Sequence, residues 1–147
     1  MTNVTDPSMD PNLDLFVKAA LGRKTIDLVV LDVRKLTSLS DVFIICSGRS
    51  NRQVSAIAEH IQLDLKKQGI TPLRVEGKKE GHWVVLDYGH VIIHVFFEPV
   101  REFYDLEGLW SDAVRIKTPG MEEYERSLTS GGKQEGVPEG VDDDEDF

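Results

Sequence analysis

Residues 82–110, "HWVVLDYGHVIIHVFFEPVREFYDLEGLW", begin as two apolar runs and end in a mixture of acidic residues, one arginine and aromatic residues. The two runs flank Gly89 and His90, and glycine at the first position favours a two-residue hairpin turn. A turn at this position pairs Leu86 with Ile93. The stretch therefore predicts an antiparallel hairpin with a defined register.

The predicted register gives the hairpin two faces of different character. One face is aliphatic and predicts a core: Val84, Leu86, Val91, Ile93 and Val95. The other face adds an indole, a carboxylate and an imidazole to apolar neighbours: Trp83, Val85, Asp87, Ile92, His94 and Phe96. Because structural histidines outnumber catalytic ones, we interpret His94 as a satisfied histidine between strands.

Two helices are predicted before the hairpin. Asp10 can cap a helix that ends at Gly22, and Ser50 and Gln53 have capping-box spacing at the start of a second helix, which Gly69 ends. Both helices place apolar residues on one face.

Further elements complete the predicted fold. Three strands are predicted at 26–33, 41–48 and 72–77, and the second is apolar enough to be covered on both faces. Asp105 caps a last helical segment that runs to residue 116. The sequence therefore predicts an α/β fold with a mixed sheet of about five strands and helices packed on it.

Charge divides the 147 residues into three segments. Residues 1–12 carry a net charge of −2 and are predicted to be a flexible N-terminus, and residues 13–118 carry +1 and are predicted to be the folded domain. Residues 119–147 hold ten Asp/Glu against two Lys/Arg and are predicted to be a disordered acidic tail. No long apolar run or secretory signal is visible, and Cys46 is the single cysteine, so we expect a cytoplasmic protein without a membrane contact.

Candidate sites for chemistry are weak. The spacing of His82, His90 and His94 fits no common zinc pattern, and we expect neither a metal nor a cofactor. The "SGRSNR" stretch at 47–52 is interpreted as a capped helix start and not as a phosphate loop.

The stretches "LSDVFIICSGRSNRQVSAIAEHI" (39–61), "VEG" (75–77), "WVVLDYGHVIIHVF" (83–96) and "REFYDLEGLW" (101–110) closely resemble the Iojap-like ribosomal silencing factors. The resemblance runs from about Leu15 to Ile116. It implies a nucleotidyltransferase-like fold and a non-enzymatic factor. Such a factor binds the large ribosomal subunit through its fourteenth ribosomal protein, blocks association with the small subunit, and represses translation under nutrient limitation.

The resemblance also implies a set of partner-binding residues: Trp83, Asp87, Tyr88, His94, Glu98, Arg101, Tyr104, Leu106, Glu107 and Trp110. Aromatic members would supply contact area, and the acidic members would complement a basic ribosomal protein. The same apolar surface could pair two copies in a homodimer when the factor is free. No direct sequence-specific nucleic-acid binding is expected.

The alternative function is that of a nucleotidyltransferase-like enzyme acting on a nucleotide triphosphate. Such enzymes hold Mg²⁺ with paired carboxylates on a strand. No Asp-x-Asp pair occurs in residues 13–118, and fold similarity alone does not supply function. We therefore expect no catalytic residue and no enzymatic activity.

Overall fold

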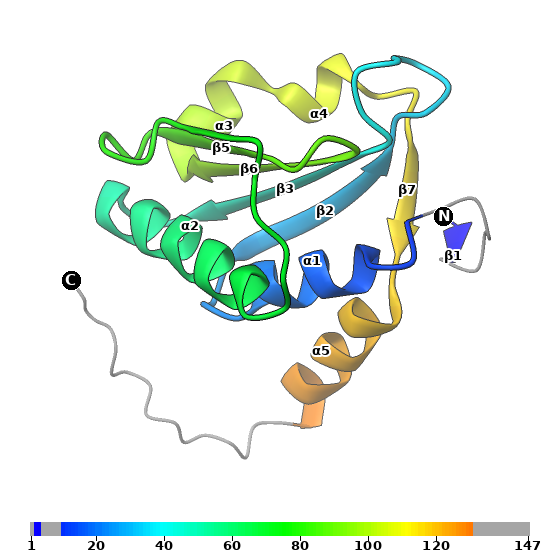
Figure 1. The fold of residues 1–147 in the computed structure, drawn as a ribbon, viewed down its shortest axis with the longest axis horizontal. Helices are drawn as coiled ribbons and strands as arrows, with labels where there is room; N and C mark the ends of the chain where they lie inside the picture. The colour runs from blue at the N-terminus through cyan, green and yellow to red at the C-terminus, as the bar shows by residue number, and fades with distance from the viewer. Residues whose placement is uncertain (1, 4–9, 131–147) are drawn as a thin grey trace.

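The computed structural model describes residues 2–3 and 10–130 and shows a mixed β-sheet between two helical layers (Figure 1). The strands are β1 (Thr2–Asn3), β2 (Ile26–Asp32), β3 (Val42–Gly48), β4 (Arg74–Glu76), β5 (Trp83–Asp87), β6 (Val91–Phe97) and β7 (Val114–Lys117). The helices are α1 (Leu13–Leu21), α2 (Asn51–Lys66), α3 (Glu98–Tyr104), α4 (Leu106–Leu109) and α5 (Pro119–Ser130). The strand order is β1-β7-β2-β3-β6-β5-β4.

The central strand β3 shows how the layers are built. It pairs with β2 in antiparallel and with β6 in parallel orientation, and all its residues are buried. Helices α1 and α2 cover one face of the sheet, while α3 and α4 cover the other (Figure 1). The interpretation of residues 41–48 as a strand covered on both faces is therefore confirmed.

The hairpin has the predicted register. Leu86 pairs with Ile93 across β5 and β6, and the Tyr88 N–H donates to the Val91 carbonyl oxygen over 2.9 Å. Gly89 has a φ of +92°, which a residue with a side chain rarely adopts. The turn residue that sequence reasoning used is thus the one that sets the register.

Two hydrophobic cores lie on the two faces of the sheet. The main core joins α1 and α2 to the aliphatic hairpin face. The smaller core lies under α3 and α4 and is built from Leu31, Val33, Phe43, Ile45 and Phe96. The second hairpin face is therefore largely covered, and His94 is buried with it.

The α/β class and the mixed sheet are confirmed, but the last helical prediction is wrong beyond residue 109. Asp105 does cap α4, since its side chain accepts from the Gly108 N–H over 3.1 Å. The chain then turns, and Val114–Lys117 forms β7, which pairs with β2 and β1. The short strand forms because it pairs with the open edge of β2, and no local sequence pattern predicts this pairing.

The boundary at residue 118 also needs correction. Residues 119–130 were predicted as part of a disordered tail, but they form α5, which packs against α1. The Gly120 N–H donates to Asp14 Oδ1 over 3.0 Å, and Met121 packs on the main core. Residues 131–147 lie outside the described part of the chain.

Of the predicted flexible N-terminus at residues 1–12, the structure describes only residues 2–3 and 10–12. Thr2–Asn3 pair with β7 as β1, and residues 1 and 4–9 are outside the description. Helix α1 begins after Asn12, so Asp10 is not its cap, although Asp10 Oδ1 accepts from the Asn12 N–H over 2.8 Å. Among the described helices, none is long and apolar enough to cross a membrane.

Candidate partner-binding surface

Helices α3 and α4 present large apolar side chains to solvent. Phe103 is 80% exposed, Leu109 75% and Tyr104 54%. Two exposed carboxylates, Glu98 and Glu102, also lie on α3. We call these five residues, together with Asp105, the α3–α4 surface. Groups of exposed apolar side chains with a polar rim mark interaction sites on monomeric proteins.

Arg101 ties this surface to the sheet. Its guanidinium is buried and donates to both Glu107 carboxylate oxygens, over 2.9 and 3.1 Å. It also donates to Ser47 Oγ over 2.7 Å, to the Asp27 carbonyl over 2.8 Å and to the Ile26 carbonyl over 3.3 Å. One side chain thus joins α3, α4, β2 and β3. The hydrogen bonds from Arg101 lower the pKa of the Glu107 carboxyl.

The backbone around Arg101 is shaped to meet it. Asp27 has a φ of +50° at an irregularity in the pairing of β2 with β3, and this turns its carbonyl oxygen to the guanidinium. Asp105 has a φ of +46° and forms the corner between α3 and α4. A Cβ on Gly108 would lie 2.1 Å from Asp105 Oδ2, so a larger residue there would displace the capping carboxylate.

An aromatic cluster supports the surface from below. The Trp83 and Tyr104 rings are 5.0 Å apart, so Tyr104 rests on Trp83 with one side and faces solvent with the other. Phe43 contacts both His94, at 5.1 Å, and Trp110, at 5.2 Å. The exposed side chains therefore stand on packed rings, which hold them in place.

His94 is a buried, neutral member of this cluster. The Trp83 Nε1–H donates to His94 Nδ1 over 3.1 Å, so the imidazole proton resides on Nε2, which has no partner among the described residues. Burial lowers the pKa of His94 to about 4. His94 is thus buried between strands, as interpreted, but only one of its two nitrogens has a hydrogen-bond partner among the described residues.

Comparison with known proteins decides the family. The family described as "Ribosomal silencing factor during starvation" matches residues 6–139. The chain belongs to the ribosomal silencing factor family. A ribosomal silencing factor of Halalkalibacterium halodurans is 38% identical over 74% of this chain and 93% of its own length. The factor of Bacillus subtilis is 38% identical over 69% and 86%. A crystal structure of a Chromobacterium violaceum protein superposes with a TM-score of 0.65 at 41% identity, over 67% of this chain and 82% of that one.

The silencing-factor fold gathers most of the predicted partner-binding residues around α3 and α4. Glu98 and Tyr104 are exposed there, while Trp83, Leu106, Glu107 and Trp110 are partly buried, and His94 and Arg101 are buried. Phe103 and Leu109 were not among the predicted site residues, although they are the most exposed apolar side chains of the two helices. The sequence could have indicated Phe103. Residues two positions apart in a helix lie on nearly opposite sides of it, so Phe103 points away from the sheet when Arg101 points toward it.

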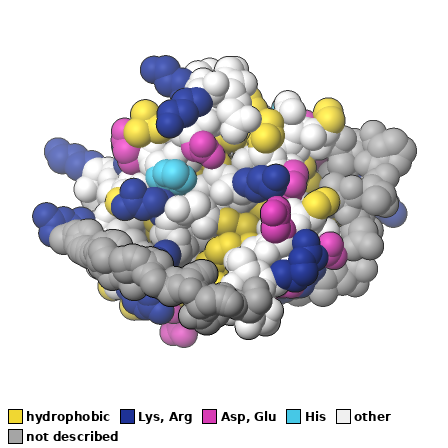
Figure 2. Space-filling model, turned by 90° about the horizontal axis from the view of Figure 1, so that it is seen from below, with side chains coloured by type: hydrophobic (Ala, Val, Ile, Leu, Met, Phe, Trp, Pro, Cys, Tyr) yellow, Lys and Arg dark blue, Asp and Glu magenta, His cyan; other side chains and the backbone are white. Residues whose placement is uncertain are grey.

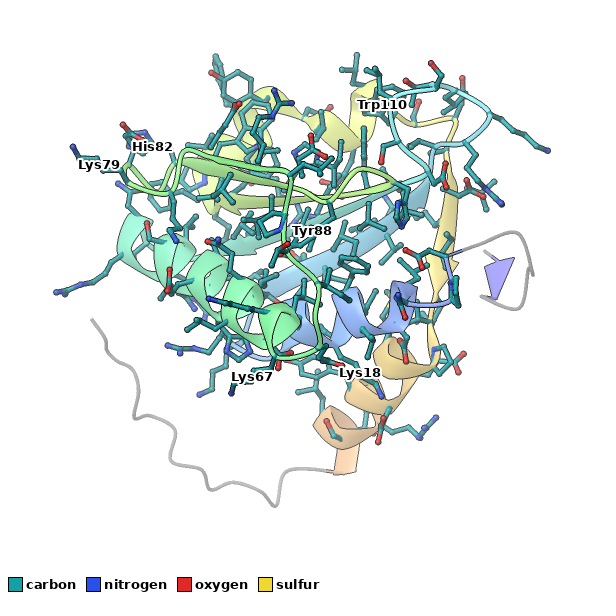
Figure 3. The ribbon with its side chains drawn as sticks, in the orientation of Figure 1. Lys18, Lys67, Lys79, His82, Tyr88 and Trp110 are labelled. Atoms are coloured by element: carbon teal, nitrogen blue, oxygen red, sulfur yellow. The ribbon has the colours of Figure 1, made fainter. Side chains whose placement is uncertain are left out.

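Two predicted site residues lie away from this surface. Tyr88 is only 7% exposed and packs on Phe16 of α1 in the main core, on the opposite face of the sheet from Trp110 (Figure 3). Asp87 stabilises the hairpin turn, since its carboxylate accepts from the Gly89 N–H over 2.8 Å and from Arg74 over 3.3 Å. Both residues have structural roles that explain their side chains.

A hollow of about 480 Å³ beside Arg101 bears on the alternative enzymatic function. Five carboxylates line it, with Arg101, Arg115, Ser47 and two apolar residues: Asp27, Glu98, Glu102, Asp105 and Glu107. The two guanidiniums face Glu107 at 2.9 and 3.8 Å. Excess negative charge repels a triphosphate, so the chemistry of the hollow does not favour nucleotidyl transfer. Within the described residues, no three His, Cys, Asp or Glu side chains form a group that could hold a metal ion.

The silencing factor should lose stability in acid because of His94. The native imidazole has a pKa of about 4, lowered by burial from 6.5, so the unfolded chain takes up this proton first as the pH falls. The stability contributed by the lowered pKa of His94 is complete above pH 6.5 and is lost between pH 6.5 and 4. Urea unfolding should show a loss of roughly 3 kcal/mol across this window.

The matched control is His94→Gln, whose amide does not titrate and can accept from Trp83 Nε1. The difference in unfolding free energy between wild type and variant removes the contribution of other titrating groups. This difference should change between pH 6.5 and 4. A difference independent of pH would show that His94 is solvated in the native protein.

Proposed function

We propose that this silencing factor binds the large ribosomal subunit through its fourteenth ribosomal protein, using the α3–α4 surface. In the cytoplasm it would thereby block association with the small subunit and repress translation under nutrient limitation. The observation that carries the proposal is the exposure of Phe103, Tyr104 and Leu109 on helices whose positions are set from below. Aromatic anchors of this kind contribute most of the energy at protein interfaces.

The charge of the surface fits a basic partner. Residues 98–112 hold five Asp/Glu against one Arg, and this residue, Arg101, is hydrogen-bonded to Glu107. The exposed carboxylates Glu98, Glu102 and Asp105 line one hollow and form an acidic rim on the same helical segment as the apolar side chains. A ribosomal protein is basic because it lies on RNA, so such a rim would steer the encounter and suppress wrong partners.

The rigidity of the surface supports tight binding. Arg101 joins the two helices to two strands, and Tyr104 rests on Trp83, so little ordering remains to be done when a partner binds. Preorganised side chains lose less conformational entropy on association. We also propose that the same apolar side chains pair two copies when the ribosomal partner is absent.

Replacing Phe103 with alanine tests the proposal. Affinity for isolated large subunits should fall by roughly 1–3 kcal/mol, the loss typical of an interface anchor. The melting temperature should stay the same, because 80% of the Phe103 side chain is already in solvent. Co-sedimentation on sucrose gradients with large or small subunits measures the binding, and light scattering during subunit joining measures the block.

The matched control is Leu63→Ala, which removes an apolar side chain that is 51% exposed on α2, in the opposite helical layer. Its binding should equal that of wild type. The proposal fails if the wild-type factor migrates equally with both subunits or with neither. Unchanged affinity of the Phe103 variant, with binding to large subunits intact, would place the interface on another face.

A further inference from the structure

Cations gather where α1 and α2 end. Five Lys/Arg side chains belong to these two helix ends and the residues just after them, and we call them the basic patch: Lys18, Arg23, Lys24, Lys66 and Lys67. Asp14 and Asp64 are the acidic residues of the same helices nearest to them in sequence. Within residues 10–130, Arg23, Lys24, Lys66 and Lys67 have no ion-pair partner within 4 Å. Figure 2 shows this face of the molecule, where a histidine lies among side chains of Lys, Arg, Asp and Glu.

The two helix ends are held together at His60. A Cβ on Gly22 would lie 2.4 Å from His60 Nε2, so α1 ends directly against the α2 side chain. Burial lowers the pKa of the His60 imidazole; the charge of Asp64 opposes this shift, and the charges of Arg23 and Lys67 add to it. Cations from both helices thus surround one point, and Lys18 and Lys67 lie on the same side of the molecule (Figure 3).

The chain carries its own polyanion close to this patch. Residues 131–147 hold seven Asp/Glu against one Lys, and five of the acids are consecutive at 142–146. The segment starts at the end of α5, which packs against α1, and Lys18 of α1 is close enough that a Cβ on Gly120 of α5 would lie 3.0 Å from its Cγ. The acidic segment therefore follows a helix whose first turn packs beside Lys18, one of the basic-patch residues.

We propose that the acidic segment 142–146 of this chain docks on its own basic patch. Eleven residues separate Ser130 from Asp142, and this linker spans roughly 20 Å as a random coil and about 40 Å at full extension. Both lengths are comparable to the size of a domain of this length, so the linker can reach the basic patch. Each exposed ion pair is weak, but the tether holds the acids at an effective concentration in the millimolar range.

Docking of the acidic segment would change which ligands can bind the basic patch. RNA phosphates are the other polyanion that fits these cations, and they would compete with the acidic segment for them. The docked segment shields the patch from RNA while the α3–α4 surface, on the opposite face of the sheet, stays open. This inference does not rest on the proposed ribosomal partner.

Paramagnetic relaxation measured on the full chain tests the contact. A nitroxide is attached to a Phe147→Cys variant, and Cys46 does not react because its thiol is buried and burial raises its pKa to about 12. Amide signals of Arg23 and Lys67 should lose intensity, whereas that of Phe103 should not. The loss should disappear in about 1 M salt, where the Debye length is about 3 Å.

Two variants serve as matched controls. Neutralising the segment with Asp142→Asn, Asp143→Asn, Asp144→Asn, Glu145→Gln and Asp146→Asn should restore the amide signals, as should Lys24→Glu with Lys67→Glu. Equal signal loss over all faces, or loss at Phe103, would overturn the proposal. Loss of equal size when the nitroxide and the ¹⁵N label are on different molecules would assign the segment to a second copy. The wild-type and neutralised chains are also compared for binding to oligouridylate. Equal affinity would show that the acidic segment does not compete with RNA for the basic patch, and this result would also overturn the proposal.

Discussion

Arg101→Ala should lower the free energy of unfolding by roughly 3–5 kcal/mol, as expected when one member of a buried ion pair is removed. Arg101 is only 9% exposed, and its guanidinium donates to Glu107, Ser47 and two carbonyl oxygens of β2. Without it, the Glu107 carboxylate and these oxygens lose their donor in a partly enclosed site. The urea midpoint should fall while the dependence on urea concentration stays the same.

The control for this change is Arg115→Ala. Arg115 approaches the same carboxylate at 3.8 Å, but its side chain is 54% exposed. Exposed pairs contribute about 0–1 kcal/mol, so this variant should unfold nearly as wild type does. Equal losses for the two variants would contradict the role of Arg101 as the buried link between α3–α4 and the sheet.

Tyr88→Ala should cost roughly 3–5 kcal/mol of stability, the range for truncating a buried aromatic residue. The side chain is 7% exposed and its ring meets Phe16 edge-on at 5.1 Å between the hairpin and α1. Its loss leaves a cavity in the main core. The fraction that remains folded should bind large subunits with unchanged affinity, because Tyr88 is on the face away from the α3–α4 surface.

Tyr88→Phe isolates the ring from the hydroxyl. The Tyr88 hydroxyl is buried without a hydrogen-bond partner among the described residues, and burial raises its pKa to about 12. Deleting an unpaired polar group from a core is neutral or stabilising, so the variant should be at least as stable as wild type. A large loss of stability in Tyr88→Phe would show that the hydroxyl is hydrogen-bonded in solution.

The assignment of these two roles illustrates where residue patterns were not informative enough. Tyr88 and Arg101 both belong to stretches that resemble the family, and both were predicted to contact the partner. A resemblance reports that a residue type is preserved in a motif, and it does not separate packing from binding. Burial made that separation, because the aromatic ring of Tyr88 and the guanidinium of Arg101 are both enclosed by segments distant in sequence.

Local patterns in the chain were enough for the α/β class, the hairpin register and the two-sided burial of β3. These features follow from alternation, turn chemistry and helical periodicity, all of which act over a few neighbouring residues. Long-range packing decided the rest: β7 is a strand because β2 accepts it, and α5 is ordered against Asp14 of α1. It also decided that Arg101 is an internal link and that Phe103 is exposed, because such burial depends on contacts that no local window of sequence contains.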